Sequence, residues 1–190
     1  MMLLALLLQA ATPATPAAPA PPAAPRPSMA DTIKPIDAAL AIDTFKTTCW
    51  AALRFPEALR AAVIQAPIAL TPVPRDQGGP EAGDLYRSDE ALLTYVASDA
   101  LPANIPSRQC TLHVRLAGTV DQLSLAGRIA TALDLPSGRT STSTAVSRTS
   151  WDMAAPDGRT TRLLAITRNA ATGGGTELRL SALLLAARQN

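Results

Sequence analysis

Apolar residues recur with a helical period where the Ala/Pro-rich start of the chain ends. Four of them follow one another at steps of three or four residues, the spacing of one apolar face of an α-helix: Ile42, Phe45, Cys49 and Leu53. We therefore predict a helix over about residues 35–53, with Asp37 near the positive end of its dipole. Pro56 fits the first turn of a second, shorter helix over residues 56–64, since a proline lacks the backbone N–H that would stay unpaired there.

The period changes to two beyond about residue 90. Around residue 112 the sequence alternates between aliphatic Leu112, Val114 and Leu116 and polar Thr111, His113 and Arg115. Such alternation is typical of a strand with one face buried and one exposed. The same reasoning predicts strands over about residues 92–98, 111–116, 143–153, 161–169 and 176–186.

A further amphipathic helix is expected between these strands, over residues 119–133. Thr119 followed by Gln122 resembles a capping box at its start, and Pro136-Ser137-Gly138 ends it. Turn-forming residues at Pro156-Asp157-Gly158 and Gly173-Gly174-Gly175 then separate the last three strands and favour antiparallel connections. The pattern predicts a two-layer α+β domain, a mostly antiparallel meander sheet with one face packed against helices and the other nearer solvent.

The N-terminus indicates export. Residues 2–8 are apolar and small residues follow, as in a short secretory signal, although no basic residue precedes them. Residues 12–27 are mostly Ala, Thr and Pro, a composition that favours an extended spacer. We expect a signal segment at 1–14, a disordered tether at 15–34 and one domain at 35–190. A plain apolar-tipped tail is the alternative. Pro13 interrupts the apolar run too early for a membrane span.

The chain has two cysteines, Cys49 on the first predicted helix and Cys110 at the head of a predicted strand. Exported proteins meet an oxidising compartment, which favours one disulfide between them. Two buried thiols and a reactive pair remain open at this stage. A redox pair is the least favoured of the three, because redox motifs place their cysteines two residues apart at a helix N-terminus.

Composition argues against a nucleic-acid partner. The formal charge is +2, basic residues occur singly along the sequence, and aromatic residues make up 3% of the chain. Nucleic-acid binders usually gather Lys and Arg on one face or in a run, with aromatic side chains for stacking.

Candidate chemistry is sparse. His113 is the only histidine, and no nucleophile motif or clustered Cys and acidic residues accompany it, so we predict no catalytic residue, no metal site and no cofactor. Its place opposite Leu112 and Val114 predicts a solvent-facing ring. Trp151 lies among polar neighbours and is, with His113, the candidate for a binding surface. Asp84, Asp89 and Glu90 form the densest acidic group, which we interpret as a solvated loop and strand edge.

Phe45-Lys46-Thr47-Thr48-Cys49, a proline soon after it, and Cys110-Thr111-Leu112-His113-Val114 form one sequence pattern. With it the chain resembles a loose group of uncharacterised small exported proteins from Ala-rich, high-GC Gram-negative bacteria. The resemblance covers about residues 43–116. It implies export and a Cys–Cys pair and brings no activity or catalytic residue.

These observations favour a non-catalytic accessory or binding protein of unknown ligand, periplasmic or secreted, with a protein or envelope component as a possible partner. One alternative is an envelope-acting hydrolase with dispersed acid and base residues. Another is a structural module that interacts through a sheet edge.

Overall fold

The structure is a computed structural model that describes residues 32–77, 83–97, 106–154, 158–169 and 175–185. The expected signal segment and nearly all of the expected tether lie outside these ranges. Ile33 and Lys34 already belong to the folded part. Ile33 is buried, and the Lys34 backbone N–H donates to the Asp89 carbonyl at 2.6 Å.

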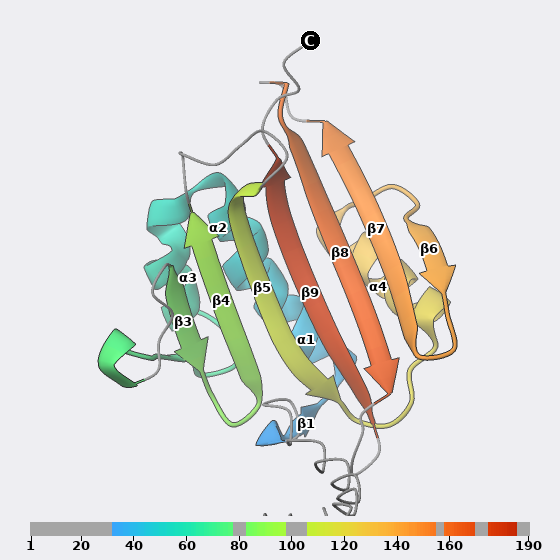
Figure 1. Cartoon of the computed structure of the whole chain (residues 1–190), viewed down its shortest axis with the longest axis horizontal. Helices are drawn as coiled ribbons and strands as arrows, with labels where there is room; N and C mark the ends of the chain where they lie inside the picture. The colour runs from blue at the N-terminus through green and yellow to red at the C-terminus, as the bar shows by residue number, and fades with distance from the viewer. Residues whose placement is uncertain (1–31, 78–82, 98–105, 155–157, 170–174, 186–190) are drawn as a thin grey trace, which may run out of the picture.

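A single nine-stranded sheet organises the described part of the chain. The strands are β1 (Pro35–Ile36), β2 (Thr71–Pro72), β3 (Asp84–Arg87), β4 (Ala91–Ala97), β5 (Pro106–Leu116), β6 (Arg139–Thr142), β7 (Val146–Ala154), β8 (Thr160–Asn169) and β9 (Thr176–Leu185). Their order is β2-β3-β4-β5-β9-β8-β7-β6, and β1 pairs with β5 off this path. Every pairing is antiparallel except that of β1 with β5 (Figure 1).

The strand order is symmetric about the β5–β9 pair. A helical segment followed by the meander β3-β4-β5 forms one half, and a second helix followed by the meander β7-β8-β9 forms the other. The last strand of each meander meets the other at the centre of the sheet. No repeat is visible in the amino-acid sequence, so the likeness of the two halves lies in topology alone.

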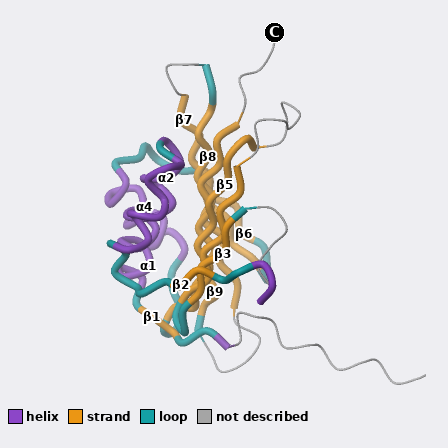
Figure 2. Tube along the Cα trace, turned by 90° about the vertical axis from the view of Figure 1, so that its left-hand side faces the viewer, coloured by secondary structure: helices purple, strands orange, loops and turns teal. Residues whose placement is uncertain are grey.

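Helices cover one face of the sheet (Figure 2). They are α1 (Ala38–Phe45), the π-helix η2 (Lys46–Trp50), α2 (Ala51–Arg54), the 3-10 helix η3 (Pro56–Ala58), α3 (Leu59–Ile64) and α4 (Gln122–Leu133). A separate 3-10 turn, η4 (Arg75–Gln77), follows β2. The first three run on without a break and lie over β5 and β9. The α4 helix lies behind β7 and β8 in Figure 1. The fold is therefore the predicted α+β arrangement.

The first predicted helix is confirmed with a later start. Pro35 and Ile36 form β1, and the Asp37 carboxylate caps α1 by accepting from the Leu40 backbone N–H at 2.9 Å. Two threonines face the core from this helix. Their hydroxyls donate to carbonyls one turn back, from Thr44 to Leu40 at 2.8 Å and from Thr48 to Thr44 at 2.7 Å, so both buried hydroxyls are satisfied.

The predicted cap of the second long helix is wrong. Asp121, not Thr119, is the N-cap of α4, and its carboxylate accepts from the Ser124 backbone N–H at 2.7 Å. A carboxylate so placed satisfies a free N–H and also suits the helix dipole. The strand predicted over residues 143–153 is confirmed as β7 with a later start. The short strand β6 before it was not predicted, and the Ser143 backbone N–H donates to the Val146 carbonyl at 2.9 Å in the turn between the two strands.

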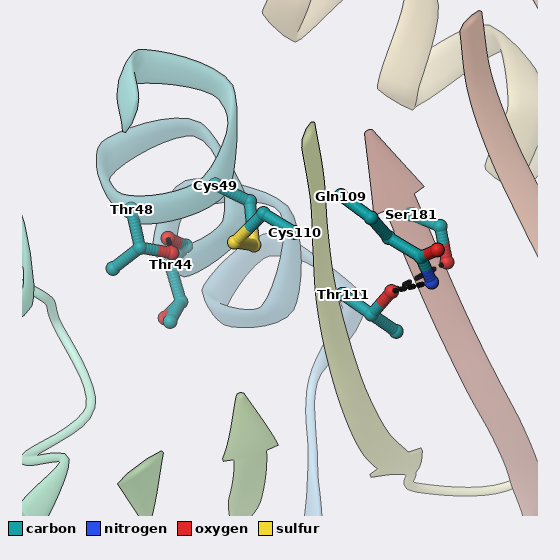
Figure 3. The surroundings of a disulfide bond; sticks show 7 residues. All are labelled: Thr44, Thr48, Cys49, Gln109, Cys110, Thr111 and Ser181. Carbon is teal, nitrogen blue, oxygen red and sulfur yellow. Dashed lines mark hydrogen bonds between the residues drawn. A yellow bond between two sulfur atoms is a disulfide. The ribbon is translucent and has the colours of Figure 1, made fainter. Parts of the chain in front are cut away.

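The core lies between the helices and the sheet. Inward side chains of β5 and β9 supply its centre, and they are Cys110, Leu112, Val114, Leu116, Leu178, Leu180, Ala182 and Leu184. Phe45 and Cys49 meet them from the helical side. Cys49 and Cys110 form a disulfide across 61 residues, which confirms the favoured of the three cysteine states (Figure 3).

Candidate functional site

The two faces of the sheet carry different residues. Residues paired directly across an antiparallel ladder point to the same face, and successive residues of a strand point to opposite faces. Cys110 on β5 is bonded to the helical layer, so the alternate residues of that strand point away from it. We call the side of the sheet opposite helices α1–α4 the open face. Figure 3 shows the disulfide on one side of β5 and the Thr111 and Ser181 side chains on the other.

Arginines gather on the open face. The pairing registers place seven there from the described residues, namely Arg87, Arg115, Arg139, Arg148, Arg162, Arg168 and Arg179, with two carboxylates, Asp152 and Glu177. The whole chain has 17 basic and 15 acidic residues. The remainder of the chain therefore has more acidic than basic residues, and the modest net charge hides a strong asymmetry.

This gathering corrects one premise of the sequence analysis. Side chains of a strand alternate between the two faces, so arginines that share a face are separated by other residues in the sequence. Strand pairing then brings these single arginines together on one face. The expectation that nucleic acid is not the partner stays a prediction, now resting on the absence of aromatic side chains from the described residues of this face. A signal was present in the sequence: within each predicted strand, arginine falls on the polar phase, as in Arg162 and Arg168 or Arg115 beside His113.

Aliphatic side chains lie between the arginines. They are Leu85, Leu92, Val96, Val146, Leu164, Ile166, Leu183 and Leu185. Their exposed fraction ranges from 9% for Leu183 to 37% for Val96. Arginine stems cover apolar surface while the guanidinium groups stay in water, so cationic and aliphatic groups alternate over this face.

Both carboxylates of the open face are engaged. Asp152 accepts two hydrogen bonds from Arg162, at 2.6 and 3.0 Å, and this contact lowers the pKa of the Asp152 carboxyl and raises the pKa of Arg162. Glu177 lies 3.6 Å from the Arg168 guanidinium. The acids thus offset two arginines, and the face remains cationic.

Hydroxyl groups connect the two central strands on this face. The Thr111 and Ser181 hydroxyls are 3.0 Å apart, and the Gln109 amide donates to Thr111 Oγ1 at 3.3 Å (Figure 3). Thr111 and Ser181 are both buried. This small polar contact fixes the register of β5 against β9 at the centre of the face.

His113 lies on the open face, as its place in the alternation predicts, but its ring is half-buried and not fully solvent-facing. Burial lowers the pKa of the imidazole below 6.5, Glu177 opposes that shift, and Arg179 and Arg168 add to it. His113 is thus held in its neutral form near neutral pH and contributes no positive charge to this face.

Trp151 is not part of a binding surface, which corrects the sequence-based expectation. It is 2% exposed and belongs to the core, because its position on β7 points to the helical side. A Cβ on Gly138 would come within 2.6 Å of the indole, so a glycine is needed at 138 for Trp151 to fit. Its polar sequence neighbours Ser150 and Asp152 misled the prediction, because they point to the other face.

The acidic group near residue 89 is a structural feature at the edge of the fold. Lys34 Nζ lies 2.8 Å from the Asp89 carboxylate, which raises the pKa of Lys34 and lowers the pKa of Asp89, and both side chains are exposed. Asp84 and Glu90 lie on β3 and in the turn before β4. In the described ranges no three histidine, cysteine or acidic side chains form a group that could hold a metal ion.

A groove lies in the helical layer. It has a volume of about 510 Å³ between α1 and α4 and is lined by Ala39, Ile42, Asp43, Ser124, Gly127, Arg128, Thr131 and Ala132. Most of these side chains are small, and the groove carries one residue of each charge. It offers space without the concentration of charge found on the open face.

Comparisons with protein-family models, curated proteins and solved structures found no match to this chain. Within the described ranges, no helix combines the length and apolarity needed to cross a lipid bilayer. The physical character of the two faces therefore carries the functional argument.

Proposed function

We propose that this protein is a non-catalytic binding protein of the cell envelope, which holds an anionic partner on its open face. The observation that carries the proposal is the convergence of seven arginines on the open face, opposite the helical layer. Like charges placed side by side repel one another and lower stability. A partner with negative charge would relieve that repulsion, which supports a role in binding.

Export is part of the proposal. The Cys49–Cys110 disulfide suits an oxidising compartment, and the apolar start of the chain suits a cleaved signal. We expect processing near residues 10–14 and a periplasmic or secreted product. N-terminal sequencing of protein from a Gram-negative host tests this. An intact Met1 on protein that fractionates with the cytosol would contradict export.

Site-specific photo-crosslinking tests the binding surface. A benzophenone amino acid in place of Ile166 or Val96 would report a partner on the open face, and Ile64 (84% exposed) and Leu123 (69% exposed) are matched sites in the helical layer. We expect a discrete adduct from the open-face sites in intact cells, lost in the Arg148→Glu/Arg179→Glu background. Adducts of equal yield from the helical sites, or none from the open face, would contradict the proposal.

A further inference from the structure

In one row of the open face, two arginines flank an aliphatic side chain, one on each side. Arg148, Ile166 and Arg179 stand side by side on β7, β8 and β9. Neighbouring strands are about 4.8 Å apart, so the bases of the two arginines are about 10 Å apart. Both arginines are exposed, and neither joins an ion pair within the described residues.

The rest of the row extends the same pattern. His113, Leu92 and Arg87 continue the row onto β5, β4 and β3, so a neutral imidazole and an aliphatic group separate this pair from a third arginine. The row on one side holds Glu177, which Arg168 engages, and Asp152 lies two rows away on the other side, where Arg162 engages it. Arg148 and Arg179 are therefore two exposed cations that no carboxylate of the described residues engages, and they stand in one row with an aliphatic side chain between them.

We propose that the partner of the open face is an acidic amphipathic α-helix of another protein, whose carboxylates pair with Arg148 and Arg179 and whose aliphatic side chains pack on Ile166. This inference rests on the proposed function, because it names what the open face binds.

The spacing of the row favours a helix over an extended segment. Same-face residues of a helix at i, i+3 or i+4, and i+7 follow one another at steps of about 5–6 Å and span about 10.5 Å. An extended chain places its same-face residues about 6.8 Å apart, which does not match steps of about 4.8 Å. Acids at i and i+7 with an aliphatic residue between them would thus meet the cation–aliphatic–cation row.

Charge argues against a segment or a second copy of this chain as the occupant. Residues 1–31 contain one acid, Asp31, and one arginine, Arg26, so they cannot neutralise the face. A two-fold contact between open faces would bring the same seven arginines of each copy together. Like-charge contacts of that kind cost several kcal/mol.

The apolar groups argue against a lipid surface or a nucleic acid. Segments that lie in a bilayer interface project Trp, Phe or Leu side chains into it, whereas Ile166 and Leu164 are half-buried in the sheet surface. Single-stranded nucleic acids are held by aromatic stacking, and the described residues of this face include no aromatic side chain. Flush aliphatic patches between arginines suit the side of a folded protein segment.

A charge-exchange experiment with the full oxidised chain tests the inference. The probes are two designed helical peptides, one with Glu at i and i+7 and Leu at i+3 and i+4 in each repeat, and one with Lys in place of Glu. Fluorescence anisotropy would compare the wild type, Arg148→Glu/Arg179→Glu, the milder Arg148→Gln/Arg179→Gln, and the control Lys46→Glu/Arg128→Glu. The control changes the charge equally at exposed positions of the helical layer.

We expect the wild type and the control to bind the Glu peptide at least tenfold more tightly than the Lys peptide. The Arg148→Glu/Arg179→Glu variant should bind the Lys peptide more tightly than the Glu peptide. The Arg148→Gln/Arg179→Gln variant should bind the Glu peptide about tenfold more weakly than the wild type does, and its affinity for the Lys peptide should not rise. Equal binding of both peptides, or equal loss in the control, would overturn the inference.

Phosphatidylglycerol vesicles and a mixed-sequence DNA oligonucleotide separate this inference from the proposed function. Binding of either one that depends on Arg148 and Arg179, without binding of the Glu peptide, would overturn the helical partner and leave open-face binding intact. An open-face crosslink in cells without Glu-peptide binding would have the same meaning. Failure of crosslinks and of all probes would overturn both.

Discussion

The two faces of one sheet differ in what their residues do for the protein. The covered face holds aliphatic side chains, a tryptophan and the disulfide, and it accounts for most of the apolar burial. The open face alternates arginine with half-buried aliphatic groups and contributes charge that folding alone does not need. The same strands build both faces, so changes at adjacent residues can test stability and binding separately.

Removal of the disulfide should give the largest effect on the covered face. A bond that closes 61 residues stabilises by about 4 kcal/mol on the chain-entropy estimate. Urea unfolding of Cys49→Ala/Cys110→Ala against the oxidised wild type measures the loss, and reduction of the wild type is the matched control. A loss below about 1 kcal/mol in both would show that the helical layer holds its place without the covalent link.

Two neighbouring leucines of β8 compare the faces directly. Leu163 is 0% exposed on the covered face, so Leu163→Ala should lower the free energy of unfolding by about 2–5 kcal/mol. Leu164 is half-buried on the open face, and Leu164→Ala should lower it by less than about 1.5 kcal/mol. Equal losses in urea titrations would contradict the contrast between the faces. We also expect Leu164→Ala, but not Leu163→Ala, to reduce crosslinking to the partner in cells.

Two glutamines give a smaller comparison. Gln122 of α4 donates to Thr149 Oγ1 at 3.0 Å and accepts from the Thr167 hydroxyl, so Gln122→Ala should lower the free energy of unfolding by about 1–3 kcal/mol. On the open face, Gln109→Ala removes one long bond to Thr111, which keeps its contact with Ser181. A loss within about 0.5 kcal/mol is expected there. The comparison fails if thermal unfolding ranks the two variants in the opposite order.

The pH dependence of stability should show the smallest effect, at His113. Because burial lowers the pKa of the folded imidazole below 6.5, the unfolded chain binds more protons between that pKa and 6.5. The free energy of unfolding should therefore fall as pH decreases from 7.5 to 5. His113 is the only histidine, so His113→Gln should flatten this change. Urea midpoints at both pH values measure it, and an unchanged slope in the variant would remove His113 as its cause.

Local patterns predicted most of the secondary structure but not the shortest strands, which depend on pairing with a neighbour. The helical stripe around Phe45 and the alternation around Leu112 each lie within one window of sequence, and both were confirmed. The strands β1 and β2 have two residues each, too few for any period, and they exist only because β5 and β3 lie beside them. Cys49 and Cys110 were predicted from the number of cysteines and the expected compartment, since a disulfide needs no local period.

The amino-acid sequence by itself determined which residues share a face of each strand and helix, because side-chain direction follows the backbone period. It also determined that the chain would form an α+β fold with one buried face. Only the tertiary structure decided which strand faces come together on one side of the sheet, because pairing joins segments far apart in the chain, such as β5 and β9. That pairing moved Trp151 into the core and gathered the separate arginines on the open face.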